Sequence, residues 1–306
     1  MSSQLNFNQS FKLLMEGNRG LSKDEVRLLS QNLRSNQNDI RSRIKLLGHF
    51  SSKKSWSRFL PHLIWMIDNS PQDPLHRHLP SELKGEAFDK ARAHWNLQVR
   101  RCPKDAVISF HAGSFCIPSC LEDAAKLIKR ASTLDLETDE FPRSLSHVYL
   151  LMSLRSPHSQ SKTFARKSAT QMKAAVERFS EPSSNDSYFL PYFDLEVAQI
   201  ADLSMRNNLI REAEELANIL LNKKLIYSRR LGTNVALVVQ DELATNLGHL
   251  VLGWVAASKG HMEMAKDHLS KIRNQEINVN LEQVLDDCGD LPNWFLRTFA
   301  TVWSRK

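Results

Sequence analysis

Residues 252–260 read LGWVAASKG, and Ala265 and Leu269 follow a few positions later. Gly253 and Ala265 carry almost no side chain, so two helices that meet at these positions can approach each other closely. Gly260 lies between them and suits the left-handed turn that commonly ends a helix. The bulky Leu269 fills a groove beside the small-residue contact. The stretch therefore predicts two short helices packed as a pair.

The same spacing recurs at two other places in the chain. One copy comprises Ile108, Ala112, Phe115, Ala124, Ile128 and Ala131. Another comprises Val197, Ile200, Ala201, Ala213 and Leu220, with Asn208 at the turn. Both His111 and His249 depart from the pattern, because they occupy positions where an apolar residue is expected. Three copies in one register favour a stack of helix pairs over the alternative, an irregular α-helical domain.

These segments resemble tetratricopeptide-like repeat proteins, over about residues 86–135 and 190–273. The stretches LLGHF at residues 46–50 and WMIDNSP at residues 65–71, taken with the Leu252-Gly253 unit, are also similar to a group of bacterial repeat proteins without a defined activity. The resemblance implies an all-α fold in which antiparallel helix pairs stack into an α-α superhelix, a TPR-like solenoid.

The chain divides into four segments by composition. We expect residues 1–20 to be disordered or loosely docked, since the N-terminus is polar. Residues 21–80 are expected to form N-terminal helical hairpins, and residues 81–180 TPR-like helix pairs. The polar stretch 181–187 is the best linker candidate. Residues 188–306 are expected to form further helix pairs that end in a C-terminal capping helix. With 10 Gly and 11 Pro and no hairpin signals, no strand is expected.

Local signals place several helix ends. Ser22 and Glu25 form the pattern of a capping box. Pro61 lies inside an apolar helical stretch and predicts a kink or restart there. Residues 72–79 are predicted to be a loop, and residues 135–142 a connector.

Composition weighs against several classes of protein. The formal net charge is +7, but the basic residues are spread in separate doublets, which indicates a solvated surface rather than a nucleic-acid site. Four cysteines are too few for a disulfide framework in 306 residues, so free thiols are expected. No secretory signal and no apolar run of membrane-spanning length is present. The expected location is the cytoplasm, without membrane contact.

No pattern predicts a catalytic, metal or cofactor site. Cys116 and Cys120 flank Pro118 at a predicted turn and are expected to be buried small residues. The histidines of the stretch 76–78 are expected in a solvated loop, and His261 and His268 at the surface or edge of a helix. Phosphate-binding glycine loops and hydrolase motifs are missing from the sequence. We therefore do not expect an enzyme.

The repeat pattern predicts a binding groove lined by the first helix of each pair. The predicted groove residues are Leu195, Asp202, Met205, Leu247, Leu250 and Trp254, with Ala198 and Ala257 beside them. Trp254 would be an apolar anchor for an amphipathic helix or an extended peptide of an unidentified protein. The alternative is that the aromatic C-terminal stretch 294–303 folds back and fills the groove, because terminal repeats must shield their apolar faces.

Two other functions compete with a protein-interaction scaffold. A nucleic-acid-binding helical repeat would need lysines and arginines gathered on one face with aromatic stacking partners, a pattern that this sequence does not show. An enzyme on a helical-hairpin scaffold would need a polar pocket with convergent side chains.

Overall fold

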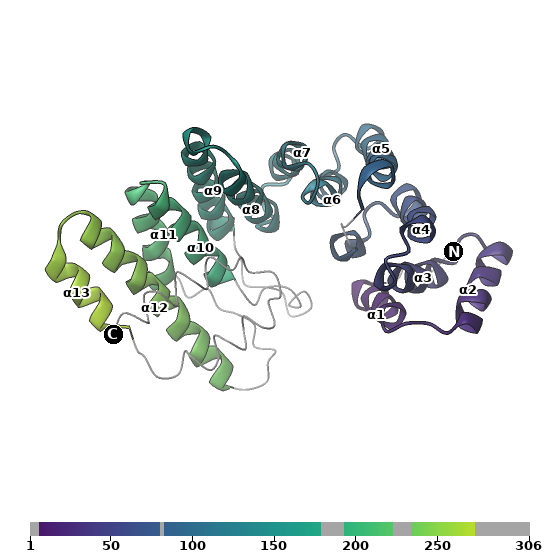
Figure 1. Ribbon diagram of the computed structural model, residues 1–306, viewed down its shortest axis with the longest axis horizontal. Helices are drawn as coiled ribbons and strands as arrows, with labels where there is room; N and C mark the ends of the chain where they lie inside the picture. The colour runs from purple at the N-terminus through teal and green to yellow at the C-terminus, as the bar shows by residue number, and fades with distance from the viewer. Residues whose placement is uncertain (1–5, 80–82, 179–192, 223–233, 273–306) are drawn as a thin grey trace. The chain divides into compact units, whose positions relative to one another are not determined.

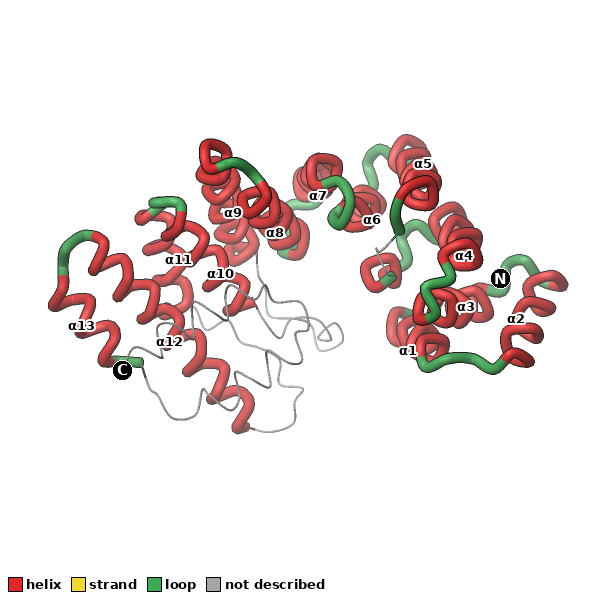
Figure 2. Tube along the Cα trace, viewed as in Figure 1, coloured by secondary structure: helices red, strands yellow, loops and turns green. Residues whose placement is uncertain are grey.

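The computed structural model describes residues 6–79, 83–178, 193–222 and 234–272. This part of the chain forms thirteen α-helices and one 3-10 helix, and it contains no strand (Figures 1 and 2). The predicted all-α class is therefore correct. The chain forms two compact units, residues 1–148 and 149–306, and the division falls inside α8 (Glu140–Arg155). The predicted linker 181–187 lies outside the described residues.

Unit 1, residues 1–148, is built from seven helices before α8. They are α1 (Phe7–Asn18), α2 (Lys23–Ser35), α3 (Ile40–Ser52), α4 (Trp56–Asn69), α5 (Gly85–Arg101), α6 (Ala106–Cys116) and α7 (Leu121–Leu134), with the 3-10 helix η1 (Pro74–His78) between α4 and α5. From α3 to α7 each helix packs against the next in sequence. Helix α1 packs against α3 instead of α2.

Unit 2, residues 149–306, contains the helices after α8. They are α9 (His158–Arg178), α10 (Phe193–Arg206), α11 (Ile210–Asn222), α12 (Asn234–Ser258) and α13 (Met262–Ser270). Each helix from α9 to α13 packs against its successor, α9 also contacts α11, and α10 also contacts α12 (Figure 1). The core is rich in alanine, and it includes the repeat residues Val197, Ile200, Ala201, Ala213 and Leu220.

Three helix–helix turns share one geometry. Lys54, Asn208 and Gly260 each have positive φ, at 52°, 54° and 79°. In each turn the next residue donates its amide N–H to a carbonyl five residues back, over 2.8 to 2.9 Å. This is the Schellman arrangement that closes a helix with a left-handed residue. The left-handed turn predicted at Asn208 is confirmed, and the same turn recurs between α12 and α13.

Capping side chains mark the starts of α1, α2, α3 and α6 in unit 1. The predicted capping box is confirmed, because Glu25 N–H donates to Ser22 Oγ and Ser22 N–H donates to the Glu25 carboxylate. Asp105 accepts from the backbone of Ile108 at the start of α6. These side chains satisfy amide groups that the first helical turn leaves without backbone partners.

The N-terminal segment does not match the expectation of a disordered or loosely docked stretch at residues 1–20. Residues 7–18 form α1, whereas residues 1–5 lie outside the described part. Phe7 and Phe11 pack on the ring of His78, with centroids 5.3 and 5.6 Å away. Gly17 and Gly48 meet where α1 crosses α3, so backbone packs on backbone. The polar composition of residues 1–20 did not predict this contact, because the contact depends on two glycines, which have no side chain.

Residues 21–80 form one packed hairpin and one peripheral helix. Helices α3 and α4 pack against each other, whereas α2 has no buried residue and packs against α3. A hairpin of α1 with α2 is therefore not formed. Helix α4 continues through Pro61, which was expected to kink or restart it.

Two predicted connectors contain helix. Helix α8 begins at Glu140 rather than after Pro142, because proline is tolerated in the first turn of a helix. The predicted loop 72–79 contains η1, which Asp73 caps by accepting from Leu75 N–H. The stretch 294–303, which was expected to form the C-terminal capping helix, lies outside the described residues.

Candidate functional site

The predicted groove residues lie at different depths in unit 2. Asp202 on α10 and Leu247 on α12 are buried, with exposed fractions of 6% and 2%. Met205 and Leu250 are half-buried against the core. Trp254 is exposed, at 37%. The side chain of Leu195 lies outside the described residues.

Asp202 and Leu247 are therefore not accessible groove residues, which corrects that part of the prediction. Helix α10 packs against α9, α11 and α12, and α12 packs against α10, α11 and α13. The repeat pattern assumes that each helix buries one apolar stripe and exposes the opposite face. A helix with three neighbouring helices buries more than one stripe, so positions on its other faces are buried as well. Ala198 is buried for the same reason.

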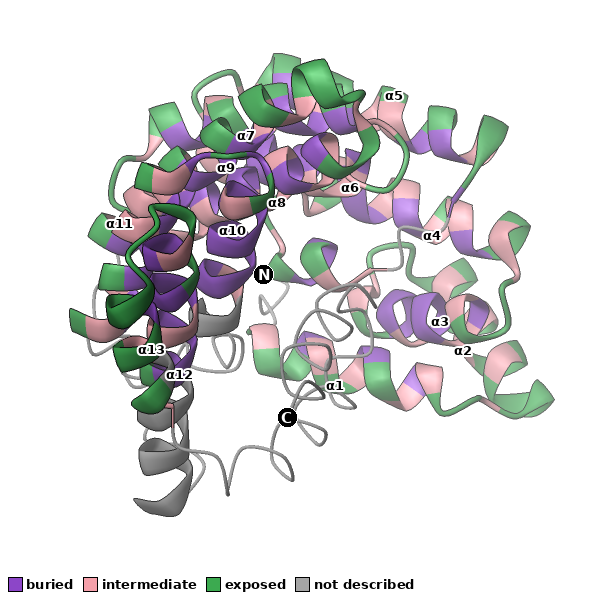
Figure 3. Ribbon diagram, turned by 60° about the vertical axis from the view of Figure 1, so that its left-hand side comes forward, coloured by how far each residue is buried: buried purple, intermediate pink, exposed green. Residues whose placement is uncertain are grey.

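Near the C-terminal end of α12, three of the four accessible positions are apolar. Between residues 250 and 258 the positions that are not buried are Leu250, Trp254, Ala257 and Ser258, whereas Val251 and Val255 face the core. Leu250, Trp254 and Ala257 are spaced by four and three residues, so they lie on one helical face. Helix α13 is largely exposed (Figure 3). The solvent-facing side of a surface helix usually carries polar residues, so three apolar residues on the accessible side of α12 are unusual. We call Leu250, Trp254 and Ala257 the α12 face.

Asp202 carries a buried carboxylate that is only partly satisfied. Its Oδ2 accepts from Arg206 Nε at 2.9 Å, and its Oδ1 has no hydrogen-bond partner. Burial raises the pKa of this carboxyl, although the charge of Arg206 opposes the shift. The Nε2 of Gln199, one turn earlier on α10, is also buried without a partner. Helix α10 therefore carries polar groups within the packed unit.

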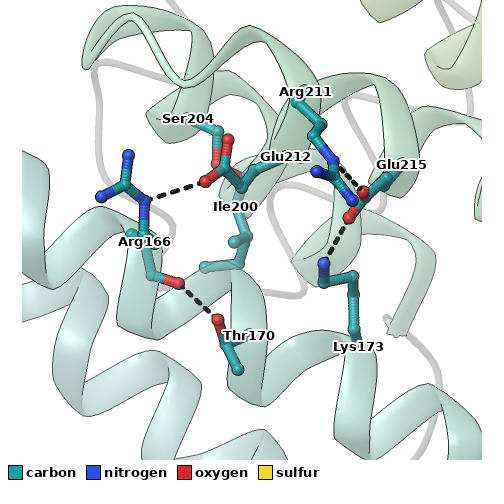
Figure 4. Close-up of polar contacts among 8 residues, drawn as sticks. All are labelled: Arg166, Thr170, Lys173, Ile200, Ser204, Arg211, Glu212 and Glu215. Carbon is teal, nitrogen blue, oxygen red and sulfur yellow. Dashed lines mark hydrogen bonds and ion pairs between the residues drawn. The ribbon is translucent and has the colours of Figure 1, made fainter.

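An ion-pair seam joins α9 to α11 (Figure 4). Arg166 Nε donates to Glu212 Oε1 at 2.9 Å. The Glu215 carboxylate accepts from both Lys173 and Arg211, and these hydrogen bonds lower its pKa. The seam shows that α9 and α11 lie side by side. Because the groups are partly solvated, each pair contributes at most about 1 kcal/mol to stability.

Comparison with known proteins does not assign a family. No protein-family model and no curated protein sequence matches this chain. What the site can do is therefore inferred from its own geometry.

Unit 1 contains a buried cluster of two histidines and a tryptophan. His76 from η1, Trp95 from α5 and His111 from α6 are all buried. The rings of His76 and Trp95 lie 4.7 Å apart in an edge-to-face arrangement, and those of His76 and His111 lie 5.6 Å apart. His76 was expected in a solvated loop, so this prediction is wrong. The turn carries it inward, between α4 and α5.

Backbone carbonyls fix the tautomers of both histidines. His76 Nε2 donates to Ser70 O at 3.0 Å, and His111 Nδ1 donates to Pro71 O at 2.9 Å. Burial lowers the pKa of His76 to about 4 and that of His111 to about 3, so both rings are neutral near pH 7. The Nε2 of His111 and the Nε1 of Trp95 have no protein partner. The cluster anchors the segment after α4 to α5 and α6.

A small cavity adjoins this cluster. It has a volume of about 60 Å³, and its lining includes His76, Arg77, Trp95 and Ser114. Arg77 is held by the Glu140 carboxylate and lies over the ring of Phe110, so its charge is compensated. A cavity of this volume can hold one or two water molecules. The cavity is too small for a substrate, and its histidines are not poised to exchange protons at neutral pH.

The contact between His76 and His111 could not be predicted from the sequence alone. His76 and His111 are far apart in the chain, and no local period relates them. The one available signal was His111 itself, which replaces an apolar residue in the repeat pattern. A histidine at a core position must find hydrogen-bond partners, and the Ser70–Pro71 turn supplies them.

The described cysteines are free thiols, as expected. Cys116 is buried, and burial raises the pKa of its thiol to about 12, whereas Cys120 is half-buried. Cys116 is therefore a structural side chain rather than a nucleophile. Within the described ranges no group of three or more metal-ligating side chains occurs, and no helix there is both long and apolar enough to span a membrane.

Proposed function

We propose that unit 2 is a protein-interaction module of the TPR-like superhelix type. It would act by binding rather than catalysis. The ordered packing from α9 to α13 and the repeated left-handed turns at Asn208 and Gly260 support the repeat architecture. Free thiols in the described residues accord with the cytoplasm as its compartment.

The α12 face is the observation that carries this proposal. An exposed tryptophan with an apolar neighbour one turn away on either side is costly to leave in water, and tryptophan is enriched among the residues that dominate binding energy at interfaces. A partner would bury Trp254 with an apolar side chain of its own. An amphipathic helix or an extended peptide presents such side chains at regular spacing.

Replacement of Trp254 by glutamate tests the proposal. The tagged full chain and its Trp254→Glu variant are used to capture proteins from the native host, and the captured proteins are quantified by mass spectrometry. We expect at least one protein that the wild type retains and the variant loses by about tenfold or more, since hot-spot residues contribute about 2 kcal/mol or more.

The matched control is Leu97→Glu. Leu97 is an apolar residue on α5 with nearly the same exposed fraction, 39%. This variant should retain the captured protein, and both variants should melt within a few degrees of the wild type by circular dichroism. Equal capture by wild type and Trp254→Glu would remove the α12 face as the binding site.

A further inference from the structure

Two histidines from the last described helix pair contact each other directly. His249 lies on α12 and His268 on α13, and their Nδ1 atoms are 3.1 Å apart. The ring centroids are separated by 5.4 Å and the ring planes are inclined by 38°. His268, which was expected at the surface or edge of its helix, is half-buried and contacts His249. His249 is also the residue that departs from the apolar pattern of the repeat.

The contact makes one ring the donor and the other the acceptor. A hydrogen bond between two Nδ1 atoms requires one of them to carry a proton and the other to accept it. Burial is the main cause that lowers the pKa of His249, the neighbouring His268 and Lys271 act in the same direction, and Asp267 opposes them. A neutral imidazole is the form of histidine that binds metal ions.

The spacing of the two nitrogens suits one metal ion. An ion at the usual zinc–nitrogen distance of about 2.05 Å from both atoms would subtend an angle of about 98° between them. This value lies between the angles of octahedral and tetrahedral coordination. For both nitrogens to bind one ion, the donor ring must carry its proton on Nε2 instead of Nδ1, and each ring must rotate so that its Nδ1 lone pair points at the ion rather than at the other ring. The half-buried position leaves the pair within reach of solvent.

The surroundings leave the remaining ligand positions to water. Asp267 is the nearest carboxylate in sequence, but Lys271 Nζ binds its Oδ2 at 2.7 Å. No third ligating side chain completes the set among the residues that the structure describes. We propose that His249 and His268 form a two-histidine site for a divalent transition-metal ion. Imidazole ligands favour Cu²⁺, Ni²⁺ and Zn²⁺, whereas Ca²⁺ and Mg²⁺ require oxygen ligands.

Calorimetric titration of the full chain with Cu²⁺ and Zn²⁺ tests the site. We expect one ion per chain to bind at this pair near neutral pH, more tightly for Cu²⁺ than for Zn²⁺. His268→Gln should weaken that binding roughly 100-fold, because the second imidazole acts as an intramolecular ligand. His249→Gln should weaken it equally, and the double variant should abolish binding at this position. The electron paramagnetic resonance spectrum of the Cu²⁺ complex should show two imidazole nitrogens.

His261→Gln is the matched control. His261 precedes α13 and is exposed, so its loss should leave the affinity unchanged. Wild-type affinity in His268→Gln would overturn the proposal, as would a Cu²⁺ spectrum that is the same in wild type and double variant. Thermal melting without metal shows whether each variant is folded. If a variant fails to fold, both rings of the native chain are carbethoxylated with diethyl pyrocarbonate instead, and bound Zn²⁺ should prevent this modification if the pair is its ligand. Equal modification with and without Zn²⁺ contradicts the site.

Discussion

Replacing Gly48 with alanine is expected to lower the free energy of unfolding by about 3 kcal/mol. A Cβ at this position would lie 2.2 Å from Leu14 O and 2.9 Å from Asn18 N. Both are backbone atoms of α1, so no side chain can rotate to relieve the collision. Helix α1 must move away from α3 as a whole, and the buried contact of Leu14 is lost with it.

Gly17 makes the reciprocal contact from the other helix. Its added Cβ would lie 2.1 Å from Lys45 O, again a backbone atom, and a Cβ added at Gly48 would lie 3.1 Å from Gly17 Cα. Gly17→Ala should therefore have an effect similar to that of Gly48→Ala. The double variant should lose less than the sum of the single effects, because α1 is already displaced in each single variant.

Urea unfolding followed by circular dichroism measures these differences, with Gly20→Ala as the control. Gly20 has a φ of 95° and open space around its Cβ position, so alanine there suffers only the conformational cost of about 1 kcal/mol. If Gly48→Ala lowers the free energy of unfolding no more than Gly20→Ala does, the backbones of α1 and α3 do not pack as closely as described.

Acid is expected to destabilise unit 1 by roughly 4 kcal/mol between pH 7 and pH 5 through His76 and His111 alone. The folded pKa values, about 4 and about 3, lie below the ordinary histidine value of 6.5. The unfolded chain therefore binds more protons than the folded protein as the pH falls below about 6.5. Each site then contributes about 2 kcal/mol of instability at pH 5.

The direction of this dependence follows from the lowered pKa values. The full stability is present above the unfolded pKa, and it decreases as the pH falls toward the folded pKa. His62 and His78 have pKa values lowered to about 4 as well, mainly by burial, and they act in the same direction. A loss of this size is a large share of the roughly 5–15 kcal/mol that stabilises a typical domain.

Urea unfolding at a series of pH values measures the dependence. The control is the double variant His76→Gln/His111→Gln, in which each glutamine can donate to a backbone carbonyl but cannot titrate. This variant should be less stable at neutral pH and less sensitive to acid. The assignment fails if the variant and the wild type lose the same stability between pH 7 and pH 5.

The sequence predicted the helices well because their signals are local. A stripe of apolar residues every three or four positions, a capping box at Ser22 and a left-handed residue at Asn208 are each contained within one or two turns. The buried small residues Ala201 and Ala213 were also predicted correctly, since they follow from the same spacing.

Contacts between distant segments could not be predicted in this way. The crossing of Gly17 with Gly48 depends on two glycines, which carry no side chain, and Gly17 lies in a polar stretch that gives no sign of a contact. The meeting of His76 with His111 depends on how the segment after α4 turns inward. Asp202 was predicted to be accessible from its repeat position, but burial is decided by the number of neighbouring helices.

The orientation of α12 is the central claim, and paired cysteine substitutions at adjacent alanines test it directly. Ala256 is buried at 5%, whereas Ala257 lies on the α12 face. In the full chain with its native cysteines replaced by serine, Ala257→Cys should react with a maleimide on the order of 100-fold faster than Ala256→Cys, because a buried thiol reacts only after local opening. Trp254→Cys should react as readily as Ala257→Cys. Equal rates at positions 256 and 257, or protection at both 254 and 257, would contradict an open apolar face on α12.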